Sequence, residues 1–207
     1  MSRIFDNLGN MSNVELNALA KNYWTDENIQ DWIAANGNIQ ARYYLAGNPG
    51  ISDSAAETLL SGRSLKAKAM LVSSGKLQSQ ETIRNIFQAV YDRNGSSWGY
   101  WKYWQTFINN PWEYRKSKPS NTPSDVIMKV FNMYWHRDEN SKKDLYRYAY
   151  TIRNSVALLK RVASHKNCPL EIGIILSSSD SPEIIKVGRD ILVNAKRQKK
   201  QVSDFVE

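Results

Sequence analysis

The stretch Leu45-Ala46-Gly47-Asn48-Pro49-Gly50-Ile51-Ser52 decides the fold, because it ends one apolar helix and begins the next. Glycine, asparagine and proline interrupt helices, and Ser52 is a favoured N-terminal cap for the helix that follows. Shorter versions of this phrase begin at Leu19 and Leu71, each 26 residues from Leu45. The spacing therefore predicts a unit of helix, polar turn and second helix that recurs along the chain.

Apolar residues elsewhere recur every three or four positions, as in Ile83, Ile86, Phe87 and Val90, which predicts helices and no sheet. Helix starts are also marked, since Ser12 to Glu15 has the layout of a capping box. A related turn phrase appears late, from residue 162 to 169. The predicted helices span 13–22, 26–36, 39–46, 53–61, 65–73, 80–92, 100–109, 123–136, 141–164, 169–177 and 182–195.

The phrase from Leu45 to Ser52, followed by an apolar helix, is similar to the L-A-x-N-P-x-(T/S) phrase of variant leucine-rich repeats and related HEAT-like α-solenoids. The resemblance covers roughly residues 19–92 and 155–195. It implies an all-α fold of stacked short helical hairpins with a concave surface that binds proteins or nucleic acids. An irregular helical bundle with similarly capped turns is the alternative. We expect a single compact domain over 1–195, an irregular aromatic-rich insert at about 94–141, and a basic C-terminal tail at 196–207.

Composition favours a cytoplasmic protein with an anionic partner. The single cysteine, Cys168, cannot form an intramolecular disulfide, and the N-terminus lacks the layout of a signal peptide. The most apolar stretch, residues 170–176, is too short to cross a bilayer, so we expect no membrane contact. The formal charge of +8 favours nucleic acid or an acidic protein surface. Frequent Asn, Lys, Ile and Ser are typical of an AT-rich genome, such as a bacteriophage has.

The most unusual segment, residues 98–118, combines aromatic rings with cations. On a helix, Trp101, Trp104 and Ile108 share one face, so part of the segment is expected to be core. The remaining rings would stack exposed bases, at roughly 1–3 kcal/mol per base, or anchor a protein interface. A second set of basic residues, which begins at Lys142, follows this segment and would extend the binding surface into a groove. The candidate binding residues are Trp98, Tyr103, Trp112, Tyr114, Arg115, Lys116, Lys118, Lys142, Lys143 and Arg147.

The C-terminal tail is a further candidate, because a charged tether from Lys196 to Lys200 precedes the apolar Val202, Phe205 and Val206. Peptides of this kind resemble those by which viral and bacterial replication and transcription proteins bind a DNA sliding clamp. A sliding-clamp-type partner is therefore one expectation. The alternative is that these apolar residues fold back onto the last helical pair.

Catalytic signals are weak. His136, His165 and one cysteine make neither a zinc cluster nor a Cys-His pair, and no phosphate-binding glycine loop occurs. We predict no catalytic residue, metal or cofactor. The expected function is a non-enzymatic adaptor that binds nucleic acid or the machinery that processes it. The alternatives are a protein-binding regulatory or structural component without nucleic-acid contact, and a helical-repeat enzyme similar to DNA glycosylases.

Overall fold

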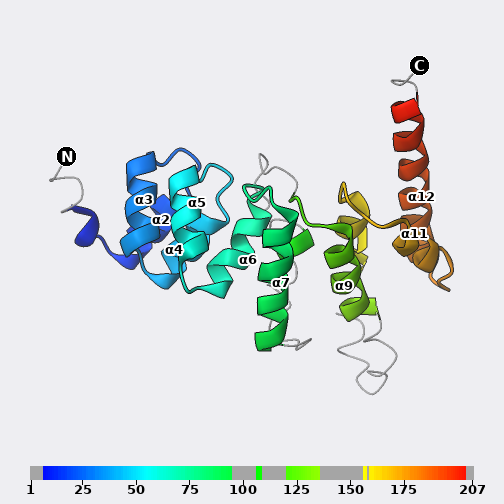
Figure 1. Cartoon of the computed structure of the whole chain (residues 1–207), viewed down its shortest axis with the longest axis horizontal. Helices are drawn as coiled ribbons and strands as arrows, with labels where there is room; N and C mark the ends of the chain where they lie inside the picture. Colours follow the sequence, from blue (N-terminus) through cyan, green and yellow to red (C-terminus); the bar gives the residue numbers. More distant parts are fainter. Residues whose placement is uncertain (1–6, 95–105, 109–119, 136–155, 158, 204–207) are drawn as a thin grey trace. The chain divides into compact units, whose positions relative to one another are not determined.

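The computed structural model describes residues 7–94, 106–108, 120–135, 156–157 and 159–203 (Figure 1). The regular elements within these ranges are all helices, which confirms the predicted all-α class. Their bounds are α2 (Asn13–Lys21), α3 (Glu27–Asn36), α4 (Ile39–Ala46), α5 (Asp53–Ser61), α6 (Leu65–Ser73), α7 (Gln80–Asn94), α9 (Ser124–Trp135), α11 (Leu170–Ser177) and α12 (Pro182–Ser203).

The chain divides into two compact units, Met1–Thr122 and Pro123–Glu207. The sequence predicted one domain over residues 1–195, and the structure does not confirm it. The division lies inside the region where the 26-residue recurrence lapses. None of the helices in the described ranges has the length and apolar character needed to cross a membrane.

Helix starts in the first unit are set by side chains that recur every 26 residues. Ser12, Asn38 and Ser64 each precede a helix and accept a hydrogen bond from the backbone N–H three residues on, at 3.3, 2.8 and 3.2 Å. The Glu15 carboxylate also accepts from the Ser12 backbone N–H at 2.8 Å, which completes the predicted capping box. These bonds satisfy N–H groups that a helix leaves unpaired in its first turn.

Three pairs of helices that lie one 26-residue interval apart in the sequence contact one another in this unit. α2 contacts α4, α4 contacts α6, and α3 contacts α5 (Figure 1). The equivalent positions Ala20, Ala46 and Val72 are fully or almost fully buried, and their small size allows close approach of the helices. The core of the first unit is therefore shared between neighbouring helical pairs.

The second unit contains a close pairing of α11 with α12. A Cβ atom added at Gly188 of α12 would lie 2.6 Å from the Ser177 backbone N and 2.8 Å from the Gly173 carbonyl O. The two backbones approach so closely that only glycine fits at residue 188. This crossing anchors the first half of α12 against the much shorter α11.

The end of α12 departs from the sequence prediction. The sequence predicted a helix that ends at residue 195 and a charged tether beyond it, but α12 continues to Ser203. Lysine, arginine and glutamine have high helix propensity, and neither proline nor glycine interrupts residues 196–203. High charge was therefore not a valid reason to predict a tether, because charged residues are compatible with a helix in water.

Candidate functional site

The ten predicted binding residues lie outside the described residues. These are Trp98, Tyr103, Trp112, Tyr114, Arg115, Lys116, Lys118, Lys142, Lys143 and Arg147. Phe205 and Val206 of the tail also lie outside them, whereas Val202 belongs to α12. The basic aromatic surface and the sliding-clamp peptide therefore stay predictions.

One turn of the aromatic-rich segment is described, and it belongs to the core. Phe107 is fully buried and Ile108 is 4% exposed. The Phe107 ring meets Phe87 of α7 edge to face, with 5.4 Å between ring centroids. Ile108 was predicted to lie on the core face by its helical spacing from Trp101 and Trp104, and its burial confirms that part of the prediction.

The turn after α4 is organised by the buried side chain of Asn48. Its Nδ2 donates hydrogen bonds to the Ala20 carbonyl O at 3.1 Å and the Asn22 carbonyl O at 2.9 Å. Its Oδ1 accepts from the Gly50 backbone N–H at 2.9 Å. The amide therefore shapes its own turn and ties it to the preceding turn. Because Asn48 is fully buried, loss of these bonds would leave unpaired polar groups in the core.

The last of these hydrogen bonds has a counterpart at the equivalent place of three other turns. Asn22, Ser74 and His165 each accept a hydrogen bond through a side-chain atom from the backbone N–H two residues on, at 3.0, 3.3 and 3.1 Å. Asn22 and Ser74 lie 26 residues before and after Asn48. His165 occupies the equivalent place in the late phrase, so the turn similarity read from the sequence extends to hydrogen bonding.

His165 serves this turn as a neutral side chain. The imidazole is 7% exposed, and its Nδ1 accepts from the Asn167 N–H, so the ring proton lies on Nε2. Burial, followed by the nearby positive charge of Lys166, lowers the pKa of His165 to about 4. Burial also raises the pKa of the neighbouring Cys168 thiol to about 12. Near neutral pH both groups are uncharged, and the thiol is a poor nucleophile.

A second buried amide connects neighbouring helical pairs. Gln30 of α3 is 1% exposed and donates through Nε2 to the carbonyl oxygens of Thr25 and Gly50, at 2.7 and 3.1 Å. Its Oε1 accepts from the Ser52 backbone N–H at 2.7 Å. Sequence reasoning missed this role. The available signal was a glutamine at a position where helical spacing predicts an apolar residue.

Aromatic rings and cations also contact one another in the first unit. The Lys21 ammonium lies 3.9 Å from the ring centroid of Tyr44, and Lys66 lies 4.4 Å from that of Tyr43, so cations from α2 and α6 both contact α4. Trp24 is 76% exposed in the turn after α2. Sequence reasoning did not select it, although its place in a polar turn was a signal of exposure.

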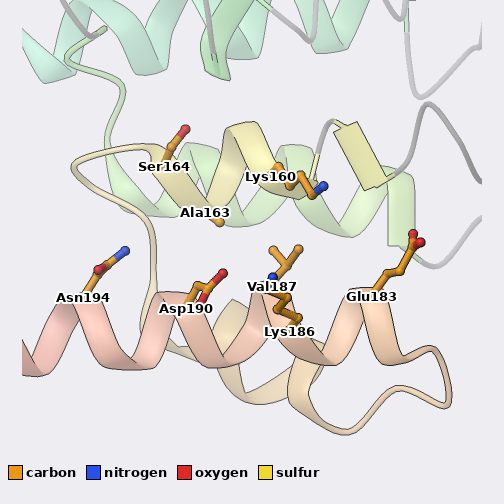
Figure 2. Close-up of a pocket in the computed structure, with 8 residues that line it drawn as sticks. All are labelled: Lys160, Ala163, Ser164, Glu183, Lys186, Val187, Asp190 and Asn194. Carbon is orange, nitrogen blue, oxygen red and sulfur yellow. The ribbon is translucent and has the colours of Figure 1, made fainter.

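The second unit contains a cleft of about 530 Å³ between the helical residues 159–164 and α12. Figure 2 shows the α12 side chains opposite those of the shorter helical segment. Glu183 and Asp190 are seven residues apart, which separates their backbone positions by about 10.5 Å along the helix, and Figure 2 shows their carboxylates at different parts of the cleft. Within the described ranges no group of three or more His, Cys, Asp or Glu could hold a metal. The lining residues are Lys160, Ala163, Ser164, Glu183, Lys186, Val187, Asp190 and Asn194.

Charge is distributed unevenly along the chain. Residues 7–94 contain eight basic and eight acidic side chains, and residues 1–6 contain one of each. The whole formal charge of +8 therefore lies in residues 95–207.

Comparison with protein-family models, curated proteins and solved structures finds no match.

Proposed function

We propose that the chain is a non-enzymatic helical-repeat module that binds nucleic acid, or the machinery that processes it, through residues downstream of residue 94. The separation of charge carries this proposal. Residues 7–94 are electrically balanced, whereas residues 95–207 hold the full excess of +8 and five of the seven tryptophans. Cations attract phosphates and exposed aromatic rings stack on bases, so this half has the composition that nucleic-acid binding requires.

We infer that the balanced half acts as a scaffold, a short α-solenoid similar to variant leucine-rich and HEAT-like repeats. Three observations support it. Three pairs of helices 26 residues apart contact one another, three N-terminal caps recur at the same interval, and the same hydrogen bond closes the turns at Asn22, Asn48 and Ser74. Stacked units of this kind give an extended rigid surface, which suits a binding protein.

The proposal is tested by binding the full chain to labelled single- and double-stranded DNA across a salt series. The variant Arg115→Gln/Lys116→Gln/Lys118→Gln removes three cations from the basic half. If each of them contacts a phosphate in duplex DNA, the slope of log affinity against log salt becomes less negative by about 2–3. The matched control, Arg63→Gln/Arg84→Gln/Arg93→Gln, removes three exposed cations from the balanced half. Its slope should stay close to that of the parent chain.

Two results would contradict the proposal. No binding to either form of DNA at about 50 mM salt would favour the alternative of a protein-binding regulator, for which the exposed Trp24 is a natural anchor. An equal change of slope in both triple variants would assign the binding to overall charge, and not to a surface in the basic half.

A further inference from the structure

α12 is long enough to present one face to its own unit and another to a partner. Its 22 residues span about 33 Å, whereas α11 has eight residues. Val187 and Ile191 on its apolar face are 4% and 3% exposed. Gly188 brings the same side of the helix against the backbone of α11. The apolar face of α12 is therefore already used for packing within the second unit.

The opposite side of α12 carries a row of cations. Lys186, Arg189 and Lys196 are exposed, and helical register places them on the same side. At 100° per residue these three positions fall within about 80° of one another around the helix axis. We name this set the basic row; it consists of Lys186, Arg189 and Lys196.

We propose that the basic row is a contact surface for the phosphate backbone of nucleic acid, an inference that rests on the proposed function and assigns it a location. From Lys186 to Lys196 the row extends for about 15 Å, a length over which each strand of a duplex presents about four phosphates. Lysine and arginine on this row match phosphates by charge. Contacts to phosphates carry no sequence information, so the row predicts binding that is independent of sequence and sensitive to salt.

The surroundings of the row favour nucleic acid over a membrane surface. An interfacial membrane helix inserts a broad apolar face, but Val187 and Ile191 are buried within the second unit. On the side of α12 that carries the row, the apolar side chain of Val193 is 46% exposed. The adjacent cleft is lined by two carboxylates, Glu183 and Asp190, and by two cations, Lys160 and Lys186, so its charges balance. The excess of positive charge on this part of α12 therefore lies along the row and not in the cleft.

The row is tested with two full-length variants that remove equal charge. Arg189→Gln/Lys196→Gln removes two cations from the row. Lys166→Gln/Lys199→Gln removes one from the turn after His165 and one from a position of α12 outside the row. Glutamine preserves helix propensity, and circular dichroism and thermal unfolding verify that both variants fold. For duplex DNA we expect the salt slope to become less negative by about 2 in the row variant and to change little in the control.

The outcomes separate this inference from the proposed function. If the parent chain binds DNA but the two variants weaken binding equally, or not at all, the row is not the contact surface and the proposed function still stands. If the parent chain binds neither form of DNA at low salt, the direct DNA binding in the proposed function is wrong, and the row falls with it. If phosphatidylserine vesicles bind the parent chain and lose binding only in the row variant, while DNA binding is unchanged, the row contacts a membrane surface.

Discussion

At the scale of single residues, the side chain that closes each turn determines how the turn responds to pH. Asn22 and Asn48 accept the N–H two residues on through an amide oxygen, which does not titrate. His165 accepts through Nδ1 and can do so only while it is neutral, because both nitrogens of a protonated imidazole are donors. The pKa of about 4 keeps it neutral at ordinary pH.

We expect the free energy of unfolding to fall as the pH is lowered from 6.5 to about 4. The unfolded chain protonates His165 below the ordinary histidine pKa of 6.5, whereas the folded chain does so only near 4, so protons favour unfolding in this window. Above 6.5 the contribution is fully present. The shift corresponds to at most about 3 kcal/mol. Urea unfolding followed by circular dichroism at several pH values in this window measures it.

The control for this prediction comes from the other turns. His165→Asn supplies the residue found at positions 22 and 48, so it retains an acceptor for the Asn167 N–H and removes the titrating group. Its pH dependence in this window should be smaller than that of the parent chain by the contribution of His165. An identical pH dependence in the two proteins would show that other groups are responsible.

The sequence predicts where the turns lie, but it does not predict the hydrogen bonds that connect one turn to the next. The sequence placed Asn48 in a polar turn from its neighbours Gly47, Pro49 and Gly50, all of which are local signals. Its hydrogen bonds to Ala20 and Asn22 span 28 and 26 residues. They depend on how α2 packs against α4, which local patterns do not specify. The buried Gln30 was missed for the same reason.

At the scale of elements, the pairing of α11 with α12 depends on the absence of a side chain at Gly188. In Gly188→Ala the new Cβ would meet backbone atoms at 2.6 and 2.8 Å, and backbone cannot move aside as a flexible side chain can. We expect a loss of about 1–3 kcal/mol from overpacking, larger than the gain in helix propensity from alanine. Thermal unfolding followed by circular dichroism measures the change.

The matched control is Gly9→Ala, since a Cβ at Gly9 meets no atom within 4 Å. It makes the same chemical change in open space and should leave the stability almost unchanged or slightly higher. A Gly188→Ala protein as stable as the control would mean that the α11 and α12 backbones do not approach as closely as the structure indicates.

Helix boundaries could be predicted well where caps mark them. α4, α5 and α6 have the predicted bounds, because Asn38, Ser52 and Ser64 precede them and each accepts a first-turn N–H. The C-terminal end of α12 could not be predicted in this way, because no glycine or proline marks it. Local stop signals are informative when they are present, whereas a charged stretch does not by itself end a helix.

At the scale of the whole molecule, the sequence located the lapse in the recurrence between about residues 94 and 141 but not the division that lies inside it. Two compact units meet in sequence between Thr122 and Pro123. Helical periodicity is a local property of each segment, so it does not indicate where long-range contacts cease. The charge imbalance marks a different boundary, because the excess of positive charge begins after residue 94, inside the first unit.

If the units of the first half stack as we propose, the chain should accept an additional one. Inserting a second copy of residues 39–64 after Ser64 places Ser64 before the new Ile39, where it can cap α4 as Asn38 does in the parent chain. The second copy also ends on Ser64, so α6 keeps its own cap. Because each stacked unit contacts only its neighbours, we expect a folded protein that unfolds cooperatively. Its helical signal should rise by the contribution of the added α4 and α5.

The control inserts residues 39–52 at the same point, which adds α4 and its turn without α5 and leaves Ser52 before α6 as a cap. The inserted α4 and α6, two helices of the same type, would then follow one another with no α5-type helix between them. We expect a lower melting temperature and a broader transition, measured by circular dichroism. A solenoid distinguishes between these insertions because its core is built from whole units, whereas an irregular bundle has no reason to tolerate the longer one. Equal disruption by both would therefore argue for the bundle.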